Sequence, residues 1–339
     1  MKLPFFTQSI AIDLGTANTV IIENGNVILN EPSIIAIYDD QNKDCIAALG
    51  HEAKLMDGKG IRTVRPLVDG VITDFNAAEM MLKGFIQQAI GKRGLLAPSL
   101  RMIIAIPKGS SEVEKRAVRE SAMHVGCREL ALIYEPMADA LGIGLDVNAS
   151  IGNMIVDIGG GTTEIAVISL GRISAWQSIR IAGNEITKDI QEYLRIQYNI
   201  IVGETTAEKI KIAIGSVMTH LPEEEAPEAF VLRGRNVITQ HPIEVKVSYP
   251  EIANCIDKTI CKIESAILEV LSQATPELYS DIVQNGIWLT GGGSLLRGIK
   301  QRFIDKFNIQ FHLADEPLKT VAKGTAEALN YPYAPYLEK

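Results

Sequence analysis

Two segments of the chain place a carboxylate just before a turn of small residues, in the same order each time. Asp13 is followed by Gly15, Thr16, Ala17, Asn18 and Thr19, and Asp157 is followed by Gly159, Gly160, Gly161, Thr162 and Thr163. Amide N–H groups and hydroxyls of such turns can surround phosphate oxygens, because no bulky side chain keeps the ligand away. A carboxylate at the end of the preceding strand can hold a hard divalent cation through the waters that the ion retains. Either turn alone is more often ordinary hairpin chemistry, but the repetition favours phosphate binding.

A third cluster of small residues lies near the end of the chain. Gly291, Gly292, Gly293 and Ser294 follow the apolar run 287–289 and precede a predicted helix. A strand, a glycine turn and a helix N-terminus in succession allow a ligand to approach the backbone and meet the positive end of the helix dipole. A tight structural turn explains the same residues equally well. The cluster lacks the GxGxxG spacing of dinucleotide-binding folds and the GxxxxGK[ST] spacing of P-loops, so both of those nucleotide-binding classes lose their main support.

The elements around these clusters alternate between helix and strand. β-Branched runs flank both Asp-containing turns and predict β-hairpins over 10–22 and 153–168, which suggests two similarly built domains. Helical periodicity predicts helices over 74–90, 111–125, 183–197, 206–214, 249–272 and 294–307, with a buried strand at 101–106 and strands within 221–247. Pro276 and Pro317 are expected in loops. The tail, residues 331–339, is rich in Pro and Tyr and is expected to pack loosely.

Composition sets limits on the function. A chain of 339 residues with 47% hydrophobic residues has enough apolar material for about two domain cores. Its net charge of −8, without a clustered basic stretch, argues against nucleic-acid binding. Four cysteines without a CxxC pair indicate a reducing cytoplasm. No run of about 18 apolar residues is free of charge, and the first residues lack the features of a secretion signal, so we expect a cytoplasmic protein that does not span a membrane.

Four motifs, taken in order, resemble those of one ATPase superfamily. They are DLGTANT at 13–19, EPMADA at 135–140, DIGGGTTE at 157–164 and TGGGSLLRG at 290–298. Together they are similar to the phosphate, connecting and adenosine motifs of the actin and heat-shock chaperone ATPase superfamily, and within it to the MreB family of bacterial actins. The resemblance extends over nearly the whole chain, from about residue 9 to residue 329.

This resemblance implies an α/β, actin-like (ribonuclease-H-like) fold, with two domains and four subdomains around a nucleotide cleft. Domain I would comprise residues 1–150, with a subdomain inserted at about 33–65, and the C-terminal segment 318–339 would return to it. Domain II would comprise residues 151–317, with a subdomain inserted at about 182–246.

The resemblance also implies roles for single residues. ATP or ADP would be bound with Mg²⁺ by both Asp-containing turns, by the third cluster and, on the adenosine side, by Ala207, Glu208, Lys209, Ile210 and Lys211. Glu135 would position and polarise the attacking water together with Thr162, while Asp13 and Asp157 would act through Mg²⁺. Hydrolysis would then rest on positioning and charge neutralisation. From the residues alone, Glu208, Lys209 and Lys211 are more simply a solvated helix face. Glu135 has the alternative of a helix-capping or ion-paired residue.

The same resemblance implies an ATPase that polymerises with itself on the inner face of the cell membrane, organises wall synthesis with cell-elongation proteins and maintains rod shape. Leu95 and Leu96, beside a basic pair, and Phe5 and Phe6 would contact the membrane. The alternative is that both pairs pack on the body of the protein. A small-molecule kinase of the same superfamily is the alternative function, although no acceptor pocket or base can be singled out.

Overall fold

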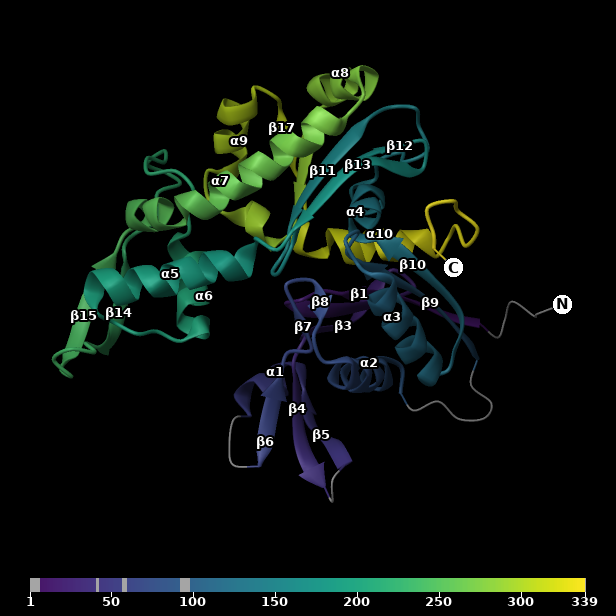
Figure 1. The fold of residues 1–339 in the computed structure, drawn as a ribbon, viewed down its shortest axis with the longest axis horizontal. Helices are drawn as coiled ribbons and strands as arrows, with labels where there is room; N and C mark the ends of the chain where they lie inside the picture. Colours follow the sequence, from purple (N-terminus) through teal and green to yellow (C-terminus); the bar gives the residue numbers. More distant parts are fainter. Residues whose placement is uncertain (1–6, 41–42, 57–59, 92–97, 339) are drawn as a thin grey trace. The chain divides into compact units, whose positions relative to one another are not determined.

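The computed structural model describes residues 7–40, 43–56, 60–91 and 98–338, and the chain separates into two compact units. The first unit comprises residues 1–151, 168–174 and 318–339, and the second comprises 152–167 and 175–317. Each unit is built on a five-stranded sheet, and each sheet carries one of the two Asp-containing turns (Figure 1).

The sheet of the first unit has the strand order β10-β9-β1-β2-β3. Its strands are β1 (Thr7–Leu14), β2 (Asn18–Glu23), β3 (Asn26–Pro32), β9 (Ser99–Ile106) and β10 (Cys127–Tyr134). β1, β9 and β10 are parallel, and β2 and β3 continue the sheet antiparallel. The predicted hairpin over 10–22 is confirmed, with Leu14 opposite Thr19, and so is the predicted strand at 101–106.

Helices cover both faces of this sheet (Figure 1). Successive side chains of a strand face opposite sides, so Ile10 and Ile12 enter the core formed with α2 (Phe75–Ile90) and α3 (Glu112–His124). Ala11 faces the other side, where it packs with Ala322 of α10 (Thr320–Ala328). The helices predicted over 74–90 and 111–125 are confirmed as α2 and α3.

Glycines allow two helices of the first unit to touch backbone to backbone. A Cβ at Gly324 of α10 would lie 1.6 Å from the carbonyl oxygen of Ala138, which belongs to α4 (Glu135–Ile143). A Cβ at Gly142 of α4 would lie 2.1 Å from the carbonyl oxygen of Thr320. Real Cβ contacts essentially never fall below 3.0 Å, so the crossing requires glycine at both positions. The crossing holds α4 in place, and with it the first residue of the helix, Glu135.

Smaller elements complete the first unit. A three-stranded sheet of order β5-β4-β6 is formed by β4 (Ile35–Asp40), β5 (Lys43–Leu49) and β6 (Ile61–Val64). The short helix α1 (Gly50–Leu55) follows β5, and β7 (Leu67–Val68) pairs with β8 (Val71–Ile72).

The sheet of the second unit has the order β13-β12-β11-β16-β17, with helices packed around it. Its strands are β11 (Asn153–Ile158), β12 (Thr163–Ser169), β13 (Arg172–Ile179), β16 (Ile287–Thr290) and β17 (Phe311–Leu313). Its helices are α5 (Gly183–Tyr198), α6 (Glu204–Ile214), α7 (Tyr249–Gln273), α8 (Pro276–Asn285) and α9 (Ile299–Phe307). β14 (Phe230–Arg235) pairs with β15 (Pro242–Val247). The predicted hairpin over 153–168, the helices 183–197, 206–214 and 249–272 and the strands within 221–247 are therefore confirmed.

The predicted start of one helix and the loop expected at Pro276 are wrong. The helix expected over 294–307 begins at Ile299, because Gly292–Leu295 forms a 3₁₀ turn and Gly298, with φ +76°, precedes the helix. No α-helix N-terminus therefore follows the third glycine cluster directly. Pro276, expected in a loop, is the first residue of α8, and Thr275 caps that helix by accepting from the Leu278 amide at 3.4 Å. Proline suits this first helical position because the amide that it lacks would be unpaired there. Pro317 likewise opens a 3₁₀ turn (Pro317–Lys319).

The expectation of a loosely packed tail is wrong for residues 336–338, although Tyr331 and Tyr333 earlier in the tail are exposed. Tyr336 and Leu337 are 8% and 9% exposed, and Glu338 exchanges backbone hydrogen bonds of 2.7 and 2.9 Å with Leu132 of β10. The Lys115 ammonium lies 3.1 Å from the Glu338 carboxylate. The tail is held because it supplies a partner to the edge of the first sheet.

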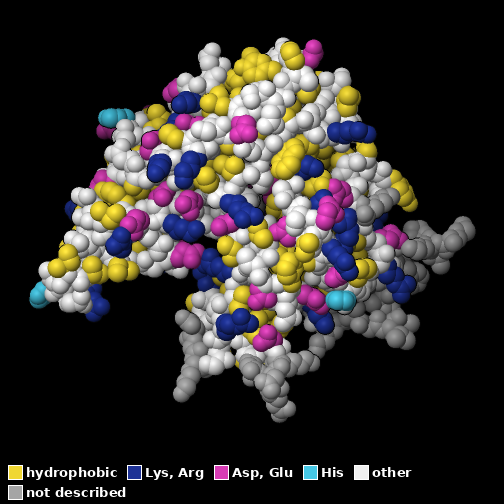
Figure 2. Space-filling model, in the orientation of Figure 1, with side chains coloured by type: hydrophobic (Ala, Val, Ile, Leu, Met, Phe, Trp, Pro, Cys, Tyr) yellow, Lys and Arg dark blue, Asp and Glu magenta, His cyan; other side chains and the backbone are white. Residues whose placement is uncertain are grey.

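The surface carries charges of both signs. On the face drawn in Figure 2, Lys and Arg side chains are interspersed with Asp and Glu. Among the described helices, none combines the length and the apolar character needed to cross a membrane.

Candidate functional site

The turn after β1 is fixed by residues from two later segments. The Ser33 hydroxyl donates to the Gly15 carbonyl at 2.6 Å, and the Gly70 amide donates to Thr16 Oγ1 at 3.0 Å. A Cβ at Gly15 would lie 2.8 Å from the Asn18 carbonyl, so only glycine lets the turn close this tightly. The first unit therefore holds the turn in one shape before any ligand binds.

Two threonines of the predicted phosphate-binding turns form hydrogen bonds within the protein that hold these turns in shape. Thr19 and Thr163 have no exposed surface. Thr19 Oγ1 lies 2.9 Å from Ser33 Oγ, and Thr163 Oγ1 donates to the Ile181 carbonyl at 2.6 Å. Residues 17–18, in contrast, are exposed. We therefore expect the two hydroxyls to hold the turns in shape and the exposed residues to meet a ligand.

The second turn contacts the start of α5. The amide of Gly183 donates to the Gly159 carbonyl at 3.1 Å, and the amide of Asn184 donates to the Gly160 carbonyl at 2.7 Å. Within the turn, the Gly159 amide donates to the Thr162 carbonyl at 3.0 Å. A Cβ at Gly183 would lie only 3.2 Å from the Gly159 carbonyl, so glycine eases this approach. The sequence does not single out Gly183 and Asn184, and the one signal was a glycine at the start of a predicted helix.

α6 brings Glu208 and Lys211 to the same part of α5. Lys211 Nζ donates to the Gly183 carbonyl at 2.8 Å and pairs with Glu208 Oε2 at 2.7 Å. Thr187 Oγ1 of α5 donates to the same carboxylate oxygen at 2.7 Å. Only 14% of the Lys211 side chain is exposed. The alternative of a solvated helix face therefore does not hold for Lys211, which is tied to the helix that supports the second turn.

The other three predicted residues of α6 lie elsewhere. Ala207 and Ile210 have no exposed surface and pack in the core of the second unit, whereas Lys209 is exposed. The buried pair therefore anchors the helix that carries Glu208 and Lys211.

The third glycine cluster packs against the end of β11. β16 runs parallel to β11 and places Thr290 opposite Asp157. A Cβ at Gly291 would lie 2.1 Å from Asp157 Oδ1, and a Cβ at Gly293 would lie 2.3 Å from Ile158 Cγ2. Gly291 also has φ +76°, in the left-handed region that favours glycine. The cluster thus forms a tight structural turn that fixes the surroundings of Asp157.

Two positions of this cluster remain open to a ligand, because Gly291 is partly exposed as well as Gly292. Gly293 and Ser294 are buried. The Ser294 hydroxyl donates to the Gly291 carbonyl at 2.6 Å and closes the turn.

Carboxylates stand where sheet strands end. In the first unit, Asp13 lies opposite Ala105 and Tyr134 lies opposite Ile106 on the intervening strand β9. The three strands are parallel, so Asp13 and Glu135, which follows Tyr134, share the carboxyl edge of the sheet, where α/β folds bind ligands. Glu135 is 8% exposed. In the second unit, Asp157, 5% exposed, lies near the end of β11.

The chemistry of Asp13 fits a divalent cation. Burial raises the pKa of its carboxyl from 3.8 to about 7, and no charged group among the described residues contributes to the shift. A hard cation nearby would stabilise the ionised form. The structure's described part contains no group of three or more His, Cys, Asp or Glu side chains suited to a metal ion. Asp13 and Asp157 remain the predicted pair that would hold Mg²⁺ through water.

Replacing Asp13 with asparagine is expected to stabilise the protein at neutral pH, without metal or nucleotide, by about 1 kcal/mol. One pKa unit corresponds to about 1.4 kcal/mol, and residual solvent contact of this side chain reduces the effect of its burial. Because the folded-state pKa is the higher one, the folded protein holds this proton more firmly than the unfolded chain. Stability should therefore fall as the pH rises from 3.8 to about 7, and the variant should lack this slope. Urea denaturation at several pH values in the presence of a chelator measures the pH dependence of stability in the parent and in the variant. The same slope in both proteins would contradict the prediction.

The four predicted membrane-contact residues lie outside the described part of the chain. They are Phe5, Phe6, Leu95 and Leu96. Their contact with a membrane stays a prediction.

Comparisons with known proteins place this geometry in a family. The MreB/Mbl protein family matches residues 7–335. The chain is 43% identical over 330 residues to the cell shape-determining protein MreB of Escherichia coli (strain K12), covering 96% of this chain and 94% of that one. It is 38% identical over 329 residues to the cell shape-determining protein Mbl of Bacillus subtilis (strain 168), covering 96% of both.

A solved structure has a similar fold over nearly the whole length of this chain. The crystal structure of MreB5 of Spiroplasma citri bound to AMPPNP has 37% sequence identity and a TM-score of 0.87, and the match covers 96% of each chain. The actin-like fold that the sequence motifs implied is thereby confirmed. On the family match and these identities, the chain belongs to the MreB/Mbl protein family.

Proposed function

We propose that the chain binds ATP and ADP, hydrolyses ATP and polymerises into filaments that determine cell shape together with cell-elongation and wall-synthesis proteins. The observation that carries the proposal is the repeated module of a carboxylate at a strand end followed by a fixed turn of small residues, once in each unit. Support comes from Spiroplasma citri MreB5, whose crystal structures are bound to AMPPNP and to ADP. The E. coli and B. subtilis relatives are cell shape-determining proteins, which supports the part in cell shape.

Different residues of the proposed site have different roles in ATP hydrolysis. The turns 15–19 and 159–163 bind phosphate oxygens, and Glu208 and Lys211 serve the adenosine side. Glu135 orients the attacking water and polarises it, with Thr162 as a second partner for that water. Asp13 and Asp157 would hold Mg²⁺ through water, and the ion would supply charge neutralisation at the phosphates. Positioning and electrostatics of this kind account for most of the catalysis in phosphoryl transfer.

We also propose that the two units are the two domains of the actin-like fold. The small sheet with α1 falls within the subdomain expected at 33–65, and α5, α6 and the β14–β15 pair fall within the one expected at 182–246.

Sedimentation with ATP, with ADP and without nucleotide tests the proposed function, with phosphate release measured in the same samples. Nucleotide-dependent pelleting together with release of inorganic phosphate is the expected result. A small-molecule kinase would instead transfer the phosphate to an added sugar or carboxylic-acid acceptor. Phosphate transfer of that kind, without pelleting, would overturn the proposal.

Replacing Leu95 and Leu96 with serine is expected to reduce binding of ATP-assembled protein to anionic liposomes and to spare assembly in solution. Burying both leucines would contribute roughly 3 to 6 kcal/mol, at about 1.5 to 3 kcal/mol each, so one monomer would bind weakly. A filament repeats the contact in every subunit and gains affinity by avidity. Co-sedimentation with liposomes measures the effect, with Phe5 and Phe6 supplying any residual binding. If a variant changed at all four positions still binds as well as the parent, membrane recruitment must come from a partner protein.

A further inference from the structure

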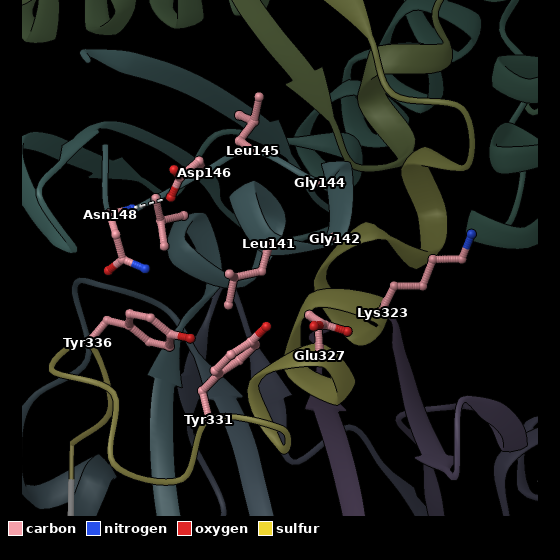
Figure 3. A pocket seen from close by; sticks show the side chains of 11 residues that line it. Leu141, Gly142, Gly144, Leu145, Asp146, Asn148, Lys323, Glu327, Tyr331 and Tyr336 are labelled. Atoms are coloured by element: carbon pink, nitrogen blue, oxygen red, sulfur yellow. Dashed lines mark hydrogen bonds between the residues drawn. The ribbon is translucent and has the colours of Figure 1, made fainter. Parts of the chain in front are cut away.

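A pocket of about 520 Å³ opens in the first unit, and none of its lining residues is assigned to nucleotide binding (Figure 3). The end of α4 and the loop after it contribute an apolar wall that includes Leu141, Leu145 and Val147. Tyr331 and Tyr336 of the tail form an aromatic wall, and α10 contributes Lys323 and Glu327. Concave sites of this size with an apolar lining and a few polar groups are typical of small-ligand binding.

Tyr336 gives the pocket a hydroxyl that has no hydrogen-bond partner among the described residues. The residue is only 8% exposed, and its hydroxyl is directed toward Leu141 and Tyr331 in Figure 3. Within the part of the chain that the structure describes, no residue forms a hydrogen bond with this hydroxyl. The hydroxyl faces the open pocket, where a ligand can reach it. A ligand in the pocket would supply the partner.

The aromatic end of the pocket is electronegative. The hydroxyls of Tyr331 and Tyr336 and the Glu327 carboxylate are directed toward the same part of the pocket (Figure 3). Burial, with Tyr331 and Glu327 nearby, raises the pKa of Tyr336. Glu327 accepts from Asn330 Nδ2 at 3.2 Å, and its carboxylate forms no ion pair with a described residue. The Lys323 side chain extends away from the tyrosines (Figure 3).

A second carboxylate lies on the opposite wall. Asp146 Oδ1 accepts from the Asn148 amide at 3.0 Å, which fixes the carboxylate at the loop after α4. The two carboxylates disfavour an anionic ligand, and the two phenol rings favour a cation, because their faces carry negative potential.

We propose that this pocket binds a guanidinium or alkylammonium group on an apolar stem. The cation lies between Glu327 and the rings of Tyr331 and Tyr336, where it makes a charge-assisted hydrogen bond and cation–π contacts. The stem packs on Leu141 and Val147. Such a group reaches the pocket either in a free amine or as the side chain of an arginine or lysine in a partner protein.

Ligand-observed NMR titration of the full chain tests the proposal with matched probes. N-acetyl-arginine amide is compared with N-acetyl-citrulline amide, its uncharged isostere. The charged probe is expected to bind at least about 10-fold more tightly, as hydrogen bonds to charged groups imply. Spermidine tests the free amine, and a short peptide with one arginine between leucines tests the side-chain source. Binding of either one supports the pocket and identifies its source, whereas equal affinity for arginine and citrulline would overturn it.

Three variants assign the binding to this pocket and not to the acidic nucleotide residues. Glu327→Gln is expected to weaken the arginine probe about 10-fold, and Tyr336→Phe should weaken it by a smaller factor. Glu277→Gln, an exposed glutamate of the second unit, should change nothing. An unaltered affinity in both Glu327→Gln and Tyr336→Phe would place the cation elsewhere and refute the proposal. Thermal unfolding confirms that each variant is folded.

Discussion

The variant Glu135→Ala is expected to hydrolyse ATP about 10²- to 10⁴-fold more slowly than the parent, with ATP affinity nearly unchanged. Glu135 is 8% exposed and begins α4, at the carboxyl edge of the first sheet. Since its proposed task is to orient and polarise water, its loss should slow the chemical step and spare nucleotide binding.

Phosphate release under saturating ATP and equilibrium nucleotide binding, measured separately, distinguish the two effects. Glu135→Gln should resemble the alanine variant, because the amide keeps the shape of the side chain and loses its basicity. Glu277→Ala is the matched control, since Glu277 also stands in the first turn of a helix beside a proline but is exposed. Equal losses of affinity and turnover would show that Glu135 holds the nucleotide or the fold instead.

The second large effect concerns stability. Gly324→Ala should lower the free energy of unfolding by about 3 kcal/mol, the upper end of the usual cost of overpacking. The new Cβ would lie 1.6 Å from the Ala138 carbonyl oxygen, and relief requires α4 and α10 to move apart. Helix propensity alone predicts the opposite sign, because alanine is about 1 kcal/mol more favourable than glycine inside a helix. The sign of the result therefore decides which effect dominates.

Chemical denaturation of the nucleotide-free protein measures this change. Gly203→Ala serves as a control, because a Cβ there meets nothing within 4 Å. Its effect should stay at about 1 kcal/mol or less, since Gly203 is the N-cap of α6 and alanine is less favourable there than glycine. Gly142→Ala should resemble Gly324→Ala, since its Cβ would meet the Thr320 carbonyl from the other side of the crossing. If Gly324→Ala is as stable as the control, the two helices do not depend on direct backbone contact.

Features that rest on neighbouring residues could be predicted from the sequence. Asp13 and Asp157 stand within a few residues of their glycine turns, so both hairpins could be recognised from local order alone. The helix over 111–125 could be placed because Ser111 and Glu114 form a capping box, a signal contained in four residues.

Features that depend on distant or three-dimensional context could not be predicted. The hydrogen bond from Gly70 to Thr16 joins residues 54 positions apart. The start of α9 depends on the backbone angles of Gly298, because TGGGSLLRG permits an α-helix or a 3₁₀ turn after Gly291. The tail resembled a loose end because nothing in its composition reveals that Glu338 pairs with Leu132.

The packing of α10 on the first sheet has a consequence for synthesis on the ribosome. Ala322 of α10 covers the sheet face formed by Ala11, Val20 and Ile22, near the start of the chain. Domains generally fold as units while the chain is being made, from the N-terminus onward. Residues 152–167 and 175–317 of the second unit emerge before α10 does. The first unit therefore begins to be synthesised first and is completed last. One apolar face of its sheet stays uncovered by α10 while the second unit is synthesised.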